Sequence, residues 1–171
     1  SPGLGAEIDL RSRGDRIVLH HDPFTDGDAL DDWLDRWADG TPRGTLVLNP
    51  KEDGLQDRVR AALADRHVED WFFLDLPLPT MVGLAVRQGE RRVAVRVSEW
   101  EPAIAARVLA GRAAWIWLDC FSGTPASIDE ARALARDFRI CLVSPELQGF
   151  PPERIADFLP LAPHAAAVCT K

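Results

Sequence analysis

The residues with the clearest chemical potential lie near the start of the chain, where Glu7 and Asp9 flank Ile8. Successive side chains of a strand point to opposite faces, so a strand here places both carboxylates on one face. Two neighbouring acids repel each other and lose hydration energy on burial, so they need a compensating cation. The pair therefore predicts a site for a metal ion or another positive charge.

A histidine pair follows at the end of a predicted hairpin. Arg13-Gly14-Asp15 predicts a turn, and Ile17-Val18-Leu19 predicts a returning strand that ends at His20-His21-Asp22. An imidazole titrates near neutral pH and can act as a general acid or base. Neighbouring side chains of a strand face opposite ways, so His20 and His21 should point in opposite directions. Taken singly, these residues also suit an exposed edge strand that merely ends in histidines.

The elements that must position these groups alternate between apolar strands and amphipathic helices. This alternation predicts an α/β fold with a parallel sheet. We expect a (β/α)8 TIM-type barrel, with seven parallel strands plus the hairpin strand. A doubly wound sheet is the alternative, disfavoured because no glycine-rich phosphate loop follows any strand. After the hairpin, the predicted strands span residues 45–51, 70–75, 92–99, 115–121, 139–146 and 165–171, and the predicted helices span 28–39, 55–66, 80–88, 102–110, 127–137 and 152–158.

Polar residues gather at the C-terminal ends of the predicted strands. In a (β/α)8 barrel these ends form the mouth that holds the active site. Strand ends are also where polar residues begin in any protein, so the pattern alone does not define a site. From these positions we assign substrate binding to Arg96, Glu99, Asp119 and Lys171.

Composition bounds the function classes. The 171 residues are 46% hydrophobic and carry a net charge of −7, which argues against nucleic acid or an anionic membrane as the main partner. The sequence shows no apolar segment long enough to cross a membrane and no signal peptide, so we expect no membrane insertion. Three widely spaced cysteines predict buried thiols in a reduced, cytoplasmic protein. We expect one domain over residues 1–171.

The Glu-x-Asp pair, the hairpin and the His-Asp step together resemble the glycerophosphodiester phosphodiesterases, within the phosphodiesterases related to phosphatidylinositol-specific phospholipase C. The resemblance implies that Glu7 and Asp9 hold a divalent metal ion, Mg²⁺ or Ca²⁺, and that His21 is an acid/base group oriented by Asp22. Relative to the family, the chain shown lacks the first strand, which ends in His-Arg, and the closing helix. We expect these parts to be trimmed from the sequence shown.

The family's third strand ends in Glu-x-Lys or Asp-x-Lys, and this chain has Asn49-Pro50-Lys51 at that place. The resemblance implies Asn49 as the third metal ligand and Lys51 as the group on the phosphate. An amide oxygen suits a hard cation, but the site then has one negative charge fewer. A surface ion pair between Lys51 and Glu52 or Asp53 is the plainer alternative. Only Lys51 and Lys171 are lysines among the 20 basic residues, a bias that suggests a GC-rich bacterial genome.

The predicted function is metal-dependent hydrolysis of a small glycerophosphodiester-like substrate, in bacterial lipid metabolism. Two alternatives stay open because a barrel hosts many chemistries. In one, Lys51 or Lys171 forms a Schiff base or an acid/base couple. In the other, the barrel binds a phosphorylated ligand without turnover.

Overall fold

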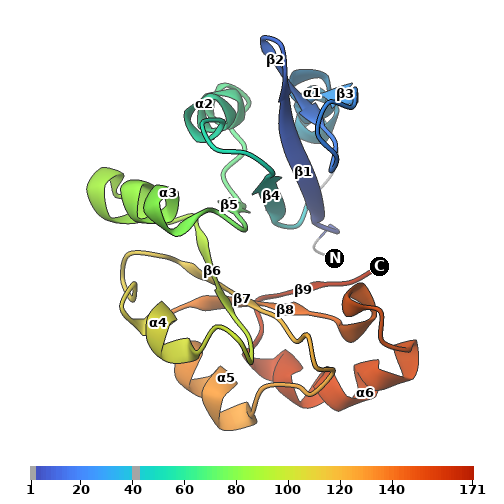
Figure 1. The fold of residues 1–171 in the computed structure, drawn as a ribbon, viewed down its shortest axis with the longest axis vertical. Helices are drawn as coiled ribbons and strands as arrows, with labels where there is room; N and C mark the ends of the chain where they lie inside the picture. The colour runs from blue at the N-terminus through green and yellow to red at the C-terminus, as the bar shows by residue number, and fades with distance from the viewer. Residues whose placement is uncertain (1–2, 40–42) are drawn as a thin grey trace. The chain divides into compact units, whose positions relative to one another are not determined.

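Two hydrogen-bonded sheets with parallel strands organise the chain, as Figure 1 shows. The structure is a computed structural model that describes residues 3–39 and 43–171. The chain divides into two compact units, residues 1–81 and 82–171, and one sheet lies in each. The mixed α/β class with parallel strands is confirmed. The single domain stays a prediction.

The sheet of the first unit has the strand order β3-β2-β1-β4-β5 in the described part of the chain. Strands β1 and β2 form an antiparallel hairpin, whereas β1, β4 and β5 run parallel. Strand β4 is buried on both faces between β1 and β5, as its continuous apolar sequence requires. The strands are β1 (Ala6–Arg13), β2 (Arg16–Leu19), β3 (Asp28–Ala29), β4 (Leu46–Pro50) and β5 (Trp71–Phe73).

Two local features of the sequence set this hairpin and the β1–β4 pair. Gly14 has a φ of +62° at the first turn position, where two-residue hairpins of type II′ take glycine. At the start of β1, a Cβ on Gly5 would lie 2.3 Å from the carbonyl oxygen of Thr45. Glycine at position 5 therefore allows the close approach of the two backbones.

Helices of the first unit bury their apolar stripes. Leu30 and Leu34 of α1 (Leu30–Ala38) are buried, and so are Val59 and Leu63 of α2 (Gln56–Asp65). Helix α1 packs against β2 and β3. Helix α3 (Leu78–Val82) continues into the π-helix η1 (Gly83–Gln88), where the sequence predicted one short helix.

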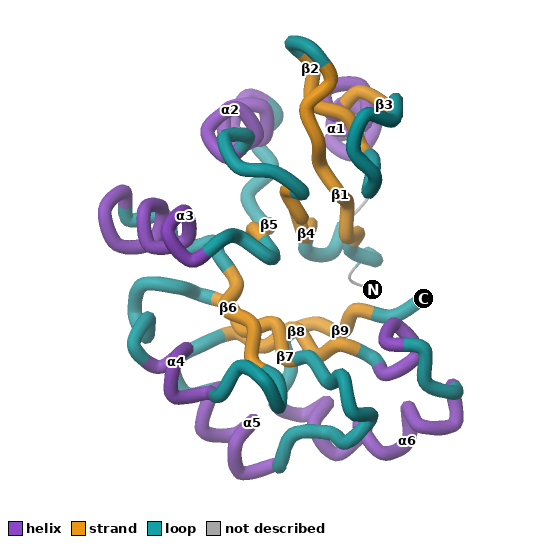
Figure 2. The backbone as a smooth tube through the Cα atoms, viewed as in Figure 1, coloured by secondary structure: helices purple, strands orange, loops and turns teal. Residues whose placement is uncertain are grey.

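The sheet of the second unit is parallel, with the order β6-β7-β8-β9. Figures 1 and 2 show α4, α5 and α6 on the same face of this sheet. The strands are β6 (Ala94–Val97), β7 (Trp115–Leu118), β8 (Arg139–Val143) and β9 (Ala167–Cys169). The helices are α4 (Ala103–Arg107), α5 (Ile128–Leu134) and α6 (Ile155–Phe158), with 3-10 turns η2 (Pro145–Gln148), η3 (Pro152–Arg154) and η4 (Leu159–His164).

The predicted elements occur in the predicted order, most of them with shorter bounds, whereas β2 and the α3–η1 helix begin one and two residues earlier than predicted. Ser127 caps α5 as predicted, since its side chain accepts a hydrogen bond of 3.1 Å from the backbone of Glu130. Strand β3, which the sequence analysis placed in a helix, is an additional element. Among the described residues the strands form two separate sheets, so closure into a barrel is not established by them.

The cysteines lie in the second unit as free thiols. Cys120 and Cys141 are buried, whereas Cys169 is half-buried. Burial raises the pKa of Cys141 to about 12, so this thiol is unreactive at neutral pH. The predicted absence of a disulfide framework agrees with this arrangement.

Glu146 joins the ends of β8 and β9. Its carboxylate accepts hydrogen bonds from the hydroxyls of Ser144 and Thr170 and from the backbone of Lys171. Partial burial alone would raise the pKa of Glu146, but the hydrogen bonds from Ser144 and Thr170 lower it to about 2. The charged form is thus the one that the fold stabilises.

We expect Glu146→Gln to lower the free energy of unfolding at pH 7 by about 1–2 kcal/mol, the usual contribution of hydrogen bonds to a charged group. Because the folded pKa is depressed, this stabilisation is present above the ordinary pKa of 4.5 and is lost as pH falls towards 2. Urea denaturation between pH 2 and 7 measures the difference. The exposed Glu153→Gln is the control and should unfold like the parent protein. A difference that does not change with pH would contradict the assignment to the carboxylate charge.

Candidate functional site

One face of β1 carries Glu7, Asp9 and Arg11. The residues between them, Ile8 and Leu10, are buried on the opposite face. The predicted common face of the two acids is therefore present.

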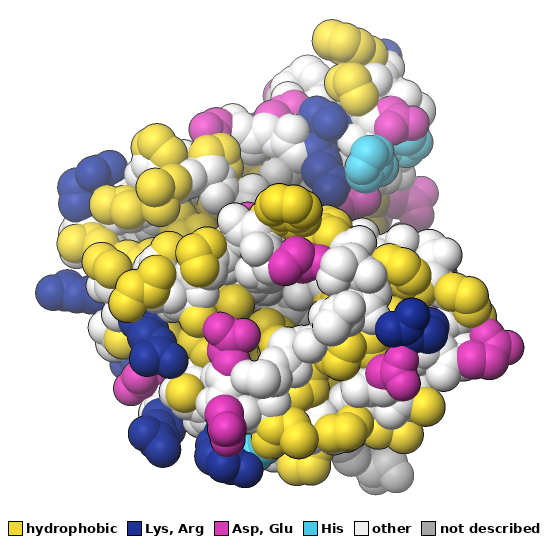
Figure 3. All heavy atoms as spheres, turned by 60° about the horizontal axis from the view of Figure 1, so that its bottom comes forward, with side chains coloured by type: hydrophobic (Ala, Val, Ile, Leu, Met, Phe, Trp, Pro, Cys, Tyr) yellow, Lys and Arg dark blue, Asp and Glu magenta, His cyan; other side chains and the backbone are white. Residues whose placement is uncertain are grey.

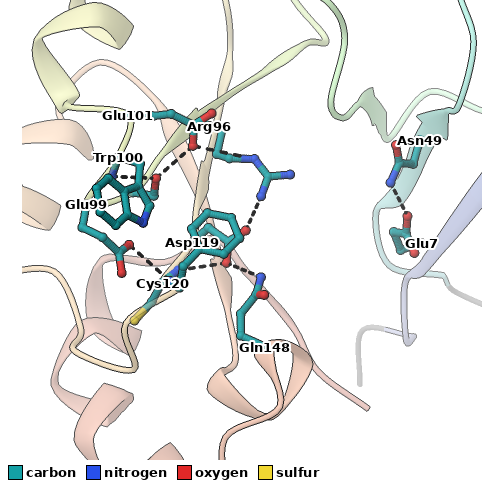
Figure 4. Close-up of polar contacts among 11 residues, drawn as sticks. Glu7, Asn49, Arg96, Glu99, Trp100, Glu101, Asp119, Cys120 and Gln148 are labelled. Atoms are coloured by element: carbon teal, nitrogen blue, oxygen red, sulfur yellow. Dashed lines mark hydrogen bonds and ion pairs between the residues drawn. The ribbon is translucent and has the colours of Figure 1, made fainter.

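Strand β4 brings an amide and an ammonium group to these acids. The parallel register pairs Asp9 with Asn49. The amide nitrogen Nδ2 of Asn49 donates a hydrogen bond of 3.1 Å to Oε1 of Glu7, and Figure 4 shows the two side chains facing each other. Lys51 Nζ lies 2.9 Å from Oδ1 of Asp9. We name this group the acid–lysine cluster (Glu7, Asp9, Asn49 and Lys51).

The electrostatics of the cluster follow from packing two acids together. Burial raises the pKa of Glu7 above its ordinary value, the hydrogen bond from Asn49 opposes the rise, and the charge of Asp9 adds to it. The charge of Lys51 lowers the pKa of Glu7 but does not cancel the rise. Glu7 is nevertheless an exposed residue of the strand, so solvent can reach this carboxylate.

Asn49 contains an unsatisfied polar atom. The residue is 6% exposed, and its buried oxygen Oδ1 has no hydrogen-bond partner within the part of the chain that the structure describes. A buried acceptor without a partner destabilises a fold by roughly 1–3 kcal/mol. A buried acceptor without a partner is unusual in a folded protein, and binding of a ligand to its lone pairs would explain it.

The donor set of the cluster fits a hard divalent cation. Two carboxylates and an amide oxygen are the ligand types that Mg²⁺ and Ca²⁺ prefer. The described residues contain no group of three or more His, Cys, Asp or Glu side chains that could hold a metal ion. A metal site with Glu7, Asp9 and Asn49 as its ligands therefore stays a prediction.

A hollow of about 290 Å³ opens at the C-terminal ends of β4 and β5. Asp75 lines the hollow. Its backbone has a φ of +54°, a conformation that residues other than glycine seldom adopt. The hollow is large enough for a small polar molecule beside Lys51. Its lining residues are Asn49, Pro50, Lys51, Glu52, Asp53, Asp75 and Pro77.

His21 lies in the loop after β2 with an exposed side chain. Its Nδ1 is 2.9 Å from Oδ1 of Asp22, and this hydrogen bond is the main cause that lowers the pKa of Asp22. Among the described residues, no hydrogen bond or ion pair joins the imidazole of His21 to Glu7, Asp9 or Lys51. The structure therefore forms the predicted His21–Asp22 pair without placing it in contact with the acid–lysine cluster.

The second unit has its own polar cluster at the strand ends. The side chain of Asp119 is 1% exposed and forms an ion pair with Arg96, as Figure 4 shows. Gln148 Nε2 and the backbone of Cys120 each donate 2.8 Å hydrogen bonds to the other oxygen of Asp119. Asp119 is thus fully engaged within the protein, and Arg96 is the member of the pair that retains some exposure.

The remaining predicted substrate-binding residues also have partners in this unit. Glu99 accepts hydrogen bonds from the backbones of Phe121 and Ser122. Burial opposes a lower pKa of Glu99, but hydrogen bonds from its own backbone, from the Ser122 side chain and from these two backbones outweigh it and lower that pKa. The backbone of Lys171 donates to Glu146. Substrate binding by these residues stays a prediction.

Trp100 follows β6 and is 79% exposed. Ile104 of α4 and Val108, just after this helix, are also exposed hydrophobic residues. Figure 3 shows one face of the molecule on which hydrophobic side chains lie among charged ones.

Sequence reasoning missed Arg11 and Gln148. Arg11 continues the alternation of Glu7 and Asp9, so its place on the polar face of β1 could have been predicted. Its contacts with two loops could not. Gln148 carries no signal in the sequence, since it reaches Asp119 from a 3-10 turn.

Comparison with known proteins gives a likeness of fold. No protein-family model and no curated protein matches the chain. The crystal structure of a candidate glycerophosphodiester phosphodiesterase from Galdieria sulphuraria matches it with a TM-score of 0.72 at 13% sequence identity. The match covers 97% of this chain and 81% of that one. At this identity the likeness shows a shared fold, and it supports the family resemblance at that level.

Within the described residues, no helix combines the length and the apolar character needed to cross a membrane.

We expect Asn49→Asp to raise the affinity for Mg²⁺ or Ca²⁺ by about tenfold or more, because added ligand charge strengthens a hard-cation site. Isothermal titration calorimetry measures both proteins. Thr25→Asp, which adds the same charge to an exposed loop of the same unit, is the control and should bind like the parent. Equal affinities for Asn49→Asp and Thr25→Asp would contradict a ligand role for residue 49.

Proposed function

We propose that the chain is a phosphodiester hydrolase whose reaction takes place at the acid–lysine cluster, with a small glycerophosphodiester-like molecule as substrate. One observation carries the proposal. An acid pair, a buried amide oxygen without a partner among the described residues, and a lysine meet at strand ends beside a hollow. The shared fold with a candidate glycerophosphodiester phosphodiesterase supports it. The closed (β/α)8 barrel is part of this proposal and rests on the family resemblance.

Lys51 supplies fixed positive charge. Its contact with Asp9 holds the ammonium group at the wall of the hollow. A phosphoryl group that enters the hollow gains negative charge on its oxygens as the ester bond breaks. A preorganised cation at that place stabilises the developing charge without moving.

His21 supplies acid/base chemistry. Because Nδ1 faces Asp22, Nε2 is the ring nitrogen that is left to exchange a proton with the substrate. Asp22 fixes the orientation of the ring through this hydrogen bond. The His21–Asp22 pair is thus suited to protonate a leaving alcohol or to remove a proton from an attacking hydroxyl.

Glu7, Asp9 and Asn49 would hold a divalent metal ion, Mg²⁺ or Ca²⁺. When bound, such an ion supplies Lewis-acid chemistry and charge neutralisation at the phosphoryl oxygens.

The geometry favours this function over a Schiff-base enzyme. A lysine that attacks a carbonyl group reacts as a neutral amine. Lys51 instead faces the carboxylate of Asp9 at 2.9 Å, which is the environment of an ammonium ion. Binding of a phosphorylated ligand without turnover is favoured by one observation, the neutral Asn49 in the third ligand place.

The test is hydrolysis of bis(p-nitrophenyl) phosphate and of glycerophosphodiesters, with Mg²⁺, with Ca²⁺ and with a chelator. We expect metal-dependent turnover that falls by about two to three orders of magnitude in Asp9→Asn, roughly the effect of removing a preorganised electrostatic partner. Asp15→Asn removes the same charge at the hairpin turn and is the matched control. Binding of glycerol phosphate without any turnover would replace the proposal with the ligand-binding function.

Lys51→Met tests the lysine separately. A strand-end lysine contributes little packing, so the melting temperature should stay nearly unchanged, whereas kcat should fall by about two to three orders of magnitude. Stopped assays and thermal unfolding of the same samples measure both quantities. Arg13→Met, at the exposed end of the hairpin, serves as the control. Full activity of Lys51→Met would show that Lys51 only forms a surface ion pair.

A further inference from the structure

Arg11 is the third polar residue on the face of β1 that carries Glu7 and Asp9. Its side chain is 17% exposed, so most of the guanidinium and its stem lie against the protein. Arg11 is not a member of the acid–lysine cluster. It contacts the two loops that carry His21 and Lys51.

The first contact is with the loop after β2. The Nε of Arg11 donates a hydrogen bond of 2.8 Å to the carbonyl oxygen of His21. This loop leaves the sheet at His20, whose backbone nitrogen donates to the carbonyl oxygen of Asp9 at 3.1 Å. The hydrogen bond from Arg11 to residue 21 therefore attaches the loop to β1 one residue beyond the end of the backbone pairing.

The second contact is with the loop after β4. Nη1 of the same guanidinium donates a hydrogen bond of 3.2 Å to the carbonyl oxygen of Lys51. The backbone nitrogen of Lys51 donates in turn to Leu10 at 2.9 Å. Residue 51 is therefore held to β1 through both its backbone N–H and its carbonyl oxygen.

Glu52 compensates the charge of Arg11. Its Oε2 lies 3.8 Å from Nη1 of Arg11, and its Oε1 accepts a 2.9 Å hydrogen bond from the backbone of Ser12. The second loop is thus attached to β1 through Arg11 and through Ser12. A planar guanidinium suits this place because its donors have fixed directions, which a lysine does not offer.

We propose that Arg11 is a positioning residue, which sets the His21 loop and the Lys51 loop relative to the acid pair on β1. The inference rests on the proposed function for its catalytic consequence. Arg11 acts through backbone carbonyls and does not touch the substrate. We call the hydrogen bonds from Arg11 to the carbonyl oxygens of His21 and Lys51 the Arg11 clamp. Loss of the clamp lets the His21 imidazole and the Lys51 ammonium group move by distances on the order of 1 Å, which is enough to reduce turnover by about 100-fold.

The test compares Arg11→Gln and Arg11→Lys with Arg58→Gln. Arg58 is a matched control, because its guanidinium also donates to a backbone carbonyl of the hairpin, that of Asp15 at the turn. We expect Arg11→Gln to lower kcat by about 100-fold with KM nearly unchanged, and Arg11→Lys to recover part of the loss by reaching one carbonyl. Arg58→Gln should keep the parent kcat. An unchanged kcat in Arg11→Gln, or an equal loss in Arg58→Gln, would overturn the proposal.

A second measurement keeps the inference separate from the proposed function. Imidazole nitrogen NMR spectra of the same variants report the environment of His21, with its signal assigned from His21→Gln. The His21 signal should shift in Arg11→Gln and stay in place in Arg58→Gln. If the parent protein hydrolyses no phosphodiester, the proposed function fails, and the NMR spectra alone decide whether Arg11 holds the loop. An unshifted His21 signal in Arg11→Gln overturns the clamp in either case.

Discussion

Repulsion between Glu7 and Asp9 is the constraint on which the first unit depends. The two carboxylates leave the same face of β1. Burial is the main cause that raises the pKa of Glu7, and the charge of Asp9 adds to the rise. Two side chains at the end of β4 offset this repulsion, because Asn49 donates a hydrogen bond to Glu7 and Lys51 forms an ion pair with Asp9. Both contacts require the observed parallel register. A slip of one residue would turn these side chains to the other face and leave the acids without partners. The register is therefore set by electrostatics as well as by apolar packing.

In the first unit the strands form the buried sheet, and the loops that follow them carry polar residues. The buried strands β4 and β5 fix the sheet, while polar residues begin where the strands end. The second unit follows the same rule, since Arg96 neutralises the buried Asp119 at the ends of β6 and β7. In both units an acid is paired with a cation from the neighbouring strand, and only Asp119 of the second unit is fully buried.

The sequence was sufficient for features that depend on local periodicity. The common face of Glu7 and Asp9, the turn at Gly14 and the cap at Ser127 follow from alternation, positive φ and side-chain capping, which are properties of short segments. It was insufficient where distant segments meet. The bonds from Arg11 to residues 21 and 51, and from Gln148 to Asp119, depend on which loops the fold brings together. Closure into a barrel depends on strand pairing between units, which periodicity does not encode.

The central claim is that the acid–lysine cluster is the cation site at which the phosphodiester reacts. Paramagnetic broadening of backbone NMR signals by a small amount of Mn²⁺, a stand-in for Mg²⁺ or Ca²⁺, tests it most directly because it locates the cation without an activity assay. The account predicts broadening centred on Glu7, Asp9 and Asn49 that disappears in Asp9→Asn. Broadening centred on other acidic residues, or broadening that Asp9→Asn leaves unchanged, would contradict it.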